Sequence, residues 1–312
     1  MFSLSKKENT DHLRLALSFH TDAISVALVE KSSDGSLELK RLEYRPVSSP
    51  EAINGELKIL GSELGLKDVP CILVLNRQHY ALLQVEAPEV EGDELKSAVR
   101  WRIKDLIDFH IDDAVIDTIM LPASRRPGAP RMMYVVAARK SYIQEIVDRF
   151  DLLGINLQTI DIPELTLRNL TFADAEENRA SALLYLKSDN SLIDICENGS
   201  LCLSRRVHLD TNRLDADRRN EVMDMLSLEI QRSLDYYESQ FANGAVSIIH
   251  FVSDGELGLE EFSSVAGSYL MQPVAELTGL SRIAGLDKFS KKLIGQCLPT
   301  IGGALRDFVW AE

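Results

Sequence analysis

The sequence predicts an α/β protein of two lobes, and three observations support this prediction. The 312 residues exceed one ordinary domain and suit two, at about 100–200 residues per domain. Apolar β runs alternate with segments of helical periodicity along the chain. The second half repeats the layout of the first, a β meander, a helix and a buried strand, without a letter-level repeat. We therefore expect a polar tail over 1–11, a first lobe over 12–173 and a second lobe over 174–312, divided near the polar stretch Asp174–Arg179.

The first lobe is predicted to open with a three-stranded meander, followed by a helix and a buried strand. The first turn of the meander is the polar segment Ser18–Asp22, and the second contains Gly35. Apolar residues then recur at helical spacing before Gly65, and a continuous apolar run suits a strand with both faces covered. In order, these elements cover Leu13–Glu30 (two strands), Leu37–Tyr44, Ser49–Leu64 (helix) and Pro70–Leu75.

A smaller unit of the order β-α-β-β-α-β is expected inside the first lobe, over 80–162. We expect its second helix to begin at a Ser141 cap and to end at Gly154. The basic, Pro/Gly-rich loop Pro122–Arg131 joins its two middle strands. In order, the elements cover Tyr80–Glu86, Gly92–Phe109 (helix), Ala114–Leu121, Met132–Ala138, Ser141–Leu153 (helix) and Leu157–Ile162, before a connecting helix over Glu164–Phe172.

The second lobe is predicted to contain a hairpin, the longest helix of the chain and a short last helix. Asn198-Gly199 is a strong hairpin turn sequence, and the last helix is expected to begin at Gly302-Gly303. The apolar stripe of the long helix consists of Leu226, Ile230, Leu234, Tyr237 and Phe241. In order, the elements cover Ser181–Leu186, Ser191–Glu197, Ser200–Val207, Asp217–Phe241 (helix), Ala245–Val252, Gly258–Tyr269 (helix), Gln272–Glu276 and Gly302–Val309 (helix).

Composition narrows the class of partner and the compartment. Lys and Arg number 34 against 48 Asp and Glu, a net charge of −14, which repels nucleic acid and anionic lipid. No stretch approaches the ~18 apolar residues of a membrane span, and the start lacks the apolar core of a secretory signal. We therefore expect a cytoplasmic protein that reaches a membrane only through another protein.

Cysteine and histidine placement predicts neither a metal site nor a disulfide framework. The four cysteines lie far apart in apolar contexts, where free Cys acts as a small buried hydrophobe. The six histidines do not pair at ligand spacing, and His250 lies in an apolar run that suits a hydrogen-bonded core histidine. No GxSxG, GxxxxGK[ST] or GxGxxG motif is present. The cysteines are Cys71, Cys196, Cys202 and Cys297.

The order of elements resembles that of the actin-like ATPase superfamily, and three stretches make the resemblance more specific. Leu228–Phe241 (LEIQRSLDYYESQF) resembles the long helix of the PilM family, the cytoplasmic actin-like component of type IV pilus assembly. Leu152–Leu165 (LLGINLQTIDIPEL) resembles the closing strand of that family's inserted subdomain, and Gly302–Arg306 (GGALR) the start of its C-terminal helix. The opening and the acidic composition are most similar to the MshI branch, from mannose-sensitive haemagglutinin pilus biogenesis. The resemblance spans about Leu13–Arg306.

The resemblance implies a two-lobed actin-like (ribonuclease-H-like) fold with a small α+β subdomain inserted in the first lobe. It also implies a partner, because family members bind the N-terminal cytoplasmic tail of a PilN-like single-span inner-membrane protein. That partner would place this chain at the inner membrane as a peripheral protein. Transferred by fold, the groove for the tail draws on Tyr80, Val85, Ala98, Trp101, Arg102 and Asp105.

Two segments near this groove allow more than one interpretation. Trp101 is either an anchor for the partner or a side chain partly packed beneath its helix. The basic loop Ser124–Gly128 is either a second contact or, as we favour, a solvated loop.

The nucleotide cleft of the family is poorly matched. The family's D-I-G-S-S turn corresponds here to Ala16–His20, its D-I-G-A turn to Leu186–Asp189 and its S-G-G turn to Ser253–Gly255. Both metal-positioning aspartates and two of the phosphate-approaching glycines are therefore missing. We expect no ATP hydrolysis, no catalytic residue and no cofactor. If Mg-ATP is bound nevertheless, the nearby polar groups are Ser18, Thr21, Lys187, Ser188, Asp189 and Gly255.

Three functions stay open on the sequence. The one we favour is a non-catalytic scaffold of a type IV pilus assembly complex. The second is an ATP-binding or weakly ATP-hydrolysing switch of the same family. The third is an actin-like component of a type II secretion platform or of cell division, and self-association is compatible with each of them.

Overall fold

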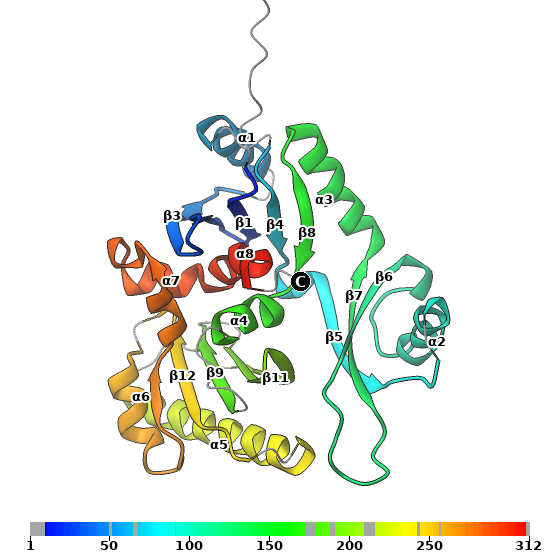
Figure 1. Cartoon of the computed structure of the whole chain (residues 1–312), viewed down its shortest axis with the longest axis vertical. Coiled ribbons are helices and arrows are strands. Elements are labelled where there is room, and N and C mark those ends of the chain that lie inside the picture. Colours follow the sequence, from blue (N-terminus) through cyan, green and yellow to red (C-terminus); the bar gives the residue numbers. More distant parts are fainter. Residues whose placement is uncertain are drawn as a thin grey trace, which may run out of the picture.

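The structure is a computed structural model that describes residues 10–49, 52–64, 68–90, 92–172, 179–187, 191–208, 216–241, 244–255 and 257–309. Most of the predicted tail and of the predicted boundary stretch lies outside these residues. The strands of the described part form three sheets (Figure 1). Two large sheets form the centres of the two lobes, and a small sheet lies to one side of them (Figure 1). The predicted lobe boundaries remain predictions.

The first lobe is built on a six-stranded sheet of order β14-β3-β2-β1-β4-β8. The meander β1-β2-β3 is antiparallel, and β4 and β8 add to it in parallel. The predicted positions of the first four strands are confirmed. The bounds are Leu13–Phe19 (β1), Ala23–Lys31 (β2), Leu37–Pro46 (β3), Cys71–Val74 (β4), Leu157–Asp161 (β8) and Ile283–Ala284 (β14).

Helices cover both faces of this sheet, which explains why β1, β2 and β4 are buried over most of their length. On one face Leu15 and Leu17 of β1 pack with α1 (Ile53–Leu64) and α3 (Lys140–Leu153). On the other face the intervening Ala16 packs with α8 (Leu298–Val309). Although α8 comes from the end of the chain, it lies with the first-lobe strands (Figure 1).

The start predicted for α8 at Gly302-Gly303 is wrong, because the helix already begins at Leu298. Both glycines lie inside the helix, where it crosses α4 (Pro163–Phe172). A Cβ on Gly302 would lie 2.0 Å from the carbonyl oxygen of Thr166, and one on Gly303 would lie 2.9 Å from Val74 Cγ2. The two glycines therefore serve close helix packing instead of helix entry.

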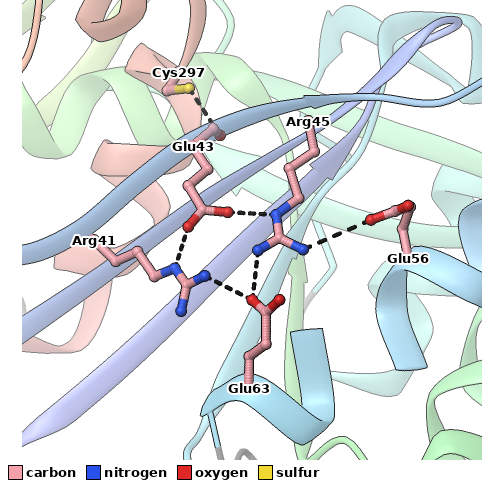
Figure 2. Close-up of polar contacts among 6 residues, drawn as sticks. All are labelled: Arg41, Glu43, Arg45, Glu56, Glu63 and Cys297. Carbon is pink, nitrogen blue, oxygen red and sulfur yellow. Dashed lines mark hydrogen bonds and ion pairs between the residues drawn. The ribbon is translucent and has the colours of Figure 1, made fainter. Parts of the chain in front are cut away.

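Charged side chains attach α1 to β3. Glu43 accepts hydrogen bonds from both Arg41 and Arg45, and the two arginines also donate to Glu63 at 2.7 and 2.6 Å (Figure 2). Arg45 lies 3.6 Å from Glu56, which is about two turns before Glu63 on the same face of α1 (Figure 2). Arg41, Glu43 and Arg45 alternate along β3 and therefore point to the same face of the sheet. Glu56 and Glu63 are seven residues apart and therefore lie on the face of α1 that meets them. Two guanidiniums shared among three carboxylates thus add to the apolar packing of α1 in the first lobe.

The small sheet has the order β5-β7-β6 and carries α2, and it covers less of the chain than predicted. β8 pairs with β4, with Thr159 beside Ile72, so the predicted closing strand of the inserted unit belongs to the first-lobe sheet. α3 also packs in the first-lobe core, through Phe150. The bounds are Tyr80–Glu86 (β5), Asp93–Ile103 (α2), Ala114–Met120 (β6) and Met132–Arg139 (β7).

Two helix ends of this region differ from the prediction. α2 stops at Ile103 and not at Phe109, because the Arg100 guanidinium donates to the carbonyls of Ile111 and Ala114 and folds the chain back. β7 runs directly into α3, so Ser141 is not its cap. Gly154, with φ +65°, ends α3 as predicted.

The second lobe has a five-stranded sheet of order β11-β10-β9-β12-β13. Asn198 and Gly199 both have positive φ, 48° and 74°, which confirms the predicted hairpin between β10 and β11. α5 (Ala216–Phe241) and α6 (Leu259–Ala266) cover one face, and the whole predicted stripe of α5 is buried. The strands are Ala180–Leu186 (β9), Ser191–Glu197 (β10), Ser200–Val207 (β11), Ile248–Ser253 (β12) and Val274–Glu276 (β13).

Buried reactive side chains have structural roles. All four cysteines are buried and free, and burial raises the pKa of each thiol. His250 is buried in β12 beside the carbonyl of Glu276, as expected for a core histidine. In the described part of the chain, no helix combines the length and apolar character of a membrane span.

Candidate functional site

A cleft lies between the two lobes, where the ends of their strands meet. It is lined from the first lobe by the ends of β1 and β4 and from the second lobe by β9, β10 and β11. Of the polar groups predicted for nucleotide, Ser18 and Lys187 line it. Thr21 and Gly255 do not line it, and Ser188 and Asp189 lie outside the described residues. The lining residues are Ser18, His20, Leu75, Asn76, Arg77, Pro163, Tyr185, Lys187, Ser191, Leu192, Arg206, Pro299 and Thr300.

The first-lobe wall of the cleft is closed by packing and by a chain of hydrogen bonds. Ala16, at the position of the family's first aspartate, is fully buried against α8. His20 Nε2 lies 3.0 Å from the hydroxyl of Ser25, which lies 2.6 Å from the hydroxyl of Thr300. Phe19 points away from the cleft into the core, beside Phe150. Ala16, Phe19 and His20, from the first predicted nucleotide turn, therefore contact other parts of the protein.

The third predicted nucleotide turn is covered by protein. Gly295 of α7 (Lys291–Gln296) lies so close that a Cβ there would be 2.0 Å from the carbonyl oxygen of Ser253. The Tyr185 hydroxyl donates to the carbonyl of Gly295 at 2.7 Å, and the Ser253 hydroxyl accepts from the Gly255 amide at 3.1 Å. The backbone of this turn is therefore packed against α7.

A buried polar junction lies next to the cleft. The Tyr80 hydroxyl of β5 donates to Glu164 of α4 at 2.6 Å. Arg206 of β11 donates to Glu164 and, at 2.8 Å, to the Tyr80 oxygen. Burial, together with the nearby Glu164 charge, raises the pKa of Tyr80 well above its usual value, so the phenol stays protonated. The junction joins the small sheet, α4 and the second lobe.

The residues predicted for partner binding fall into two groups. Tyr80 and Val85 are buried, with exposed fractions of 6% and 9%, so their side chains are not on the surface. Ala98, Trp101, Arg102 and Asp105 follow one side of α2 and the turn after it.

Trp101 is the exposed aromatic on this side of α2. Its exposed fraction is 73%, so the interpretation as a partly packed side chain is wrong. The Lys104 ammonium lies 5.1 Å from its ring centroid, and Arg102 lies 3.5 Å from Glu86. The surface thus offers a flat apolar ring with cations beside it.

The basic loop between β6 and β7 reaches the second lobe. Arg126 Nε donates to the carbonyl of Ser239 at 2.6 Å, and the Ser124 hydroxyl and the Arg125 amide donate to the carbonyl of Gln240 at 3.0 and 3.2 Å. These carbonyls belong to the last turn of α5, which carries no basic residue of its own. Donors and positive charge at a helix C-terminus are stabilising. The loop is thus an internal contact, which neither sequence interpretation included.

Comparison with known proteins identifies the architecture. No family model matches the chain, and no curated protein matches it. The chain is similar to a solved structure described as a PilM-PilN type IV pilus biogenesis complex, at 20% identity over 95% of this chain and 98% of that chain, with a TM-score of 0.70. It is also similar to a Bacteroides thetaiotaomicron protein with an actin-like ATPase fold and unknown function, at 10% identity over 88% and 95% of the two chains, with a TM-score of 0.50. The fold is actin-like.

The actin-like fold confirms the predicted fold class. The cavity described above lies between the six-stranded and five-stranded sheets. Sequence analysis found Ser18 and Lys187 through the expected turns. It missed Arg77 and Arg206, since neither belongs to an expected turn. An arginine directly after a buried strand, as in LVLNR, is the sequence feature that could have located Arg77.

Proposed function

We propose that this actin-like chain is a non-catalytic scaffold of a type IV pilus assembly complex. The observation that carries the proposal is similarity across 95% of the chain to the structure described as a PilM-PilN complex. The finer assignment, to the MshI branch of mannose-sensitive haemagglutinin pilus biogenesis, rests on the resemblance in the sequence. The protein would be cytoplasmic and peripheral at the inner membrane, held there by its partner.

The partner we propose is the N-terminal cytoplasmic tail of a PilN-like single-span protein. Trp101 is its anchor on α2, because large exposed aromatics contribute most binding energy when a partner covers them. Ala98, Arg102 and Asp105 flank the ring on the same side of the helix. Val85 packs beneath α2 with Val99 and Ile103, whereas Tyr80 is buried at the junction with Glu164, so neither side chain contacts the tail in this proposal.

The absence of catalysis is proposed from the walls of the cleft. Hydrolysis in this fold needs carboxylates that position a metal ion and a water molecule. Ala16 replaces one of them and is enclosed by α8, and Leu186 occupies the position of the other as a buried residue. The covered turn at Ser253 removes a further ligand contact.

The test uses a synthetic tail peptide from the PilN-like partner and the full chain. We expect the peptide to raise the melting temperature. At a peptide concentration of 100 times its Kd, the free energy of unfolding should increase by about 2.7 kcal/mol. Trp101→Ala should lose at least about tenfold in affinity, whereas Leu152→Ala, another exposed apolar residue on a different helix, should bind as the native protein does. An unchanged affinity for the Trp101 variant would reject the anchor. Stabilisation by Mg-ATP with ATP turnover would favour the switch instead of the scaffold.

A further inference from the structure

The interlobe cleft is cationic in an acidic protein. Its lining includes Arg77, Lys187 and Arg206 and no aspartate or glutamate among the described residues. The chain as a whole has 48 acidic residues against 34 basic ones. A concave site lined by one sign of charge concentrates the field and the opposite ion. The cleft thus has the opposite polarity to the average surface.

Of the two arginines of the cleft, Arg206 is bound to a buried carboxylate. Glu164 is fully buried and is already bound by Arg206 and Tyr80. Arg77 donates to the carbonyl of Tyr80, and its guanidinium lies 5.0 Å from that ring centroid. Within the described residues Arg77 forms no ion pair. One positive charge at this end of the cleft is therefore not compensated.

A second buried acid lies close to Glu164 but does not supply the missing charge. Asp194 of β10 is 1% exposed. Burial, and then the neighbouring Glu164, raise the pKa of Asp194 well above its usual value, which favours the neutral carboxyl group. Burial, and then the charge of Arg206, lower the pKa of Arg77, but an arginine stays charged at neutral pH. Two guanidiniums that repel each other thus face the same cavity.

We propose that the cleft binds a small phosphate-class anion without a metal ion, with Arg77 and Arg206 as its counter-charges. Arginine guanidinium suits this ligand because its planar donors match phosphate oxygens. A Mg²⁺ ion is bound through carboxylates and phosphates together, and the described residues of the lining offer no carboxylate. The cavity of about 70 Å³ has room for an inorganic phosphate. Free phosphate and the terminal phosphate of a nucleotide share this chemistry.

This inference deepens the proposed loss of nucleotide hydrolysis and is independent of partner binding. The cations replace the charge that a magnesium ion supplies, so anion binding needs no metal. Added Mg²⁺ should weaken the binding of ATP, because the metal neutralises the phosphates that the arginines would contact. At a site that used magnesium, added Mg²⁺ would instead strengthen the binding of ATP.

The experiment measures the melting temperature and the calorimetric affinity of the full chain with three probes at matched ionic strength. The probes are inorganic phosphate with EDTA, ATP with EDTA, and ATP with Mg²⁺. We expect inorganic phosphate with EDTA to stabilise the native protein. A response to ATP with EDTA as well shows that the site accepts a terminal phosphate, and a response to phosphate alone identifies the free ion as the ligand.

Arg77→Gln is the variant of choice, because it removes the uncompensated charge and leaves the ion pair of Arg206 intact. Its affinity for inorganic phosphate should fall about tenfold or more, the loss expected for a charge-assisted hydrogen bond. The control Arg232→Gln removes an exposed arginine on α5 and should bind phosphate as the native protein does. The melting temperature of each variant without anion checks that it is folded.

The proposal is overturned if phosphate with EDTA leaves the native protein unchanged. It is also overturned if Arg77→Gln binds phosphate as well as the native chain, or if only ATP with Mg²⁺ stabilises. The PilN-like tail peptide is titrated into the native chain and the same variants. A native chain that binds the peptide but does not respond to phosphate rejects the anion site alone, and a native chain that responds to phosphate but does not bind the peptide rejects the partner alone.

Discussion

The hydroxyl of Tyr80 donates a 2.6 Å hydrogen bond to the fully buried carboxylate of Glu164, which lies 84 residues further along the chain. Arg206, from the other lobe, binds both groups. Three parts of the molecule are therefore joined through one buried charge. A buried carboxylate that loses a donor is destabilised, because no water replaces the lost partner.

Tyr80→Phe should lower the free energy of unfolding by about 1–3 kcal/mol, because it removes one donor to Glu164 and retains the ring. Urea denaturation followed by circular dichroism measures the change. Tyr269→Phe, at an exposed tyrosine, is the matched control and should change stability by less than about 0.5 kcal/mol. Equal stabilities for the two variants would contradict the assigned role of the hydrogen bond.

Asp194→Asn should stabilise the protein more as the pH rises. The folded-state pKa of Asp194 is raised, so the native chain loses stability as the pH rises above the unfolded value of about 3.9 towards the folded value. The slope of this loss is about 1.4 kcal/mol per pH unit for one group. Asparagine has no such ionisation and keeps the shape of the neutral acid.

Melting temperatures between pH 5 and 8 for the native protein and Asp194→Asn test this prediction. The difference between the two should grow with pH. Asp117→Asn, at an exposed position on β6, provides the comparison. A difference that shrinks with pH would mean that Asp194 is ionised and held by a cation in the folded protein.

Gly302→Ala should be strongly destabilising, by about 3 kcal/mol or more, because the added methyl would meet the backbone of Thr166 at 2.0 Å. Gly61→Ala is the control, since Gly61 also lies in a helix and has open space around its Cα. It should stabilise α1 by about 0.5–1 kcal/mol. Thermal unfolding measures the stability of both variants. Equal changes in stability for Gly302→Ala and Gly61→Ala would contradict the close packing assigned to Gly302.

Arg126→Glu should loosen the contact between the β6–β7 loop and α5. The substitution places a negative charge at a helix C-terminus, which costs about 0.3–1 kcal/mol beyond the lost hydrogen bond. Hydrogen exchange and limited proteolysis of the loop should both become faster. Arg126→Lys should retain most of the protection, because it keeps the positive charge. A loop equally protected in both variants would show that charge is not what holds it.

Strands and helices with strong local patterns were predictable from the sequence. Asn198-Gly199 allows little besides a tight hairpin, and the stripe from Leu226 to Phe241 matches one face of a helix. The incorrect predictions concern tertiary packing, which the local sequence does not determine. Leu157 and its neighbours form a good strand beside either sheet, and only the packing of α3 and the partner β4 decide between them. Gly302-Gly303 looks like a helix entry until α4 is known to cross there.

The candidate site was only partly predictable for the same reason. Ser18 and Lys187 follow predicted strands, so the comparison of turns placed them at the cleft. Arg77 and Arg206 belong to none of the expected turns, and only the folded chain brings them to the same cavity. Trp101 was recognised, but its exposure depends on where α2 ends and what covers it.

The position of α8 has a consequence for biosynthesis. This helix completes one face of the first-lobe sheet, and Arg14 of β1 is bound to Asp307 of α8 at 2.7 Å. Chains usually fold from the N-terminus while the ribosome is still translating. Here the first lobe stays incomplete, with an apolar sheet face uncovered, until α8 has been synthesised. The nascent chain therefore exposes this apolar face for almost the whole of translation, and a product that stops before α8 lacks a complete first lobe.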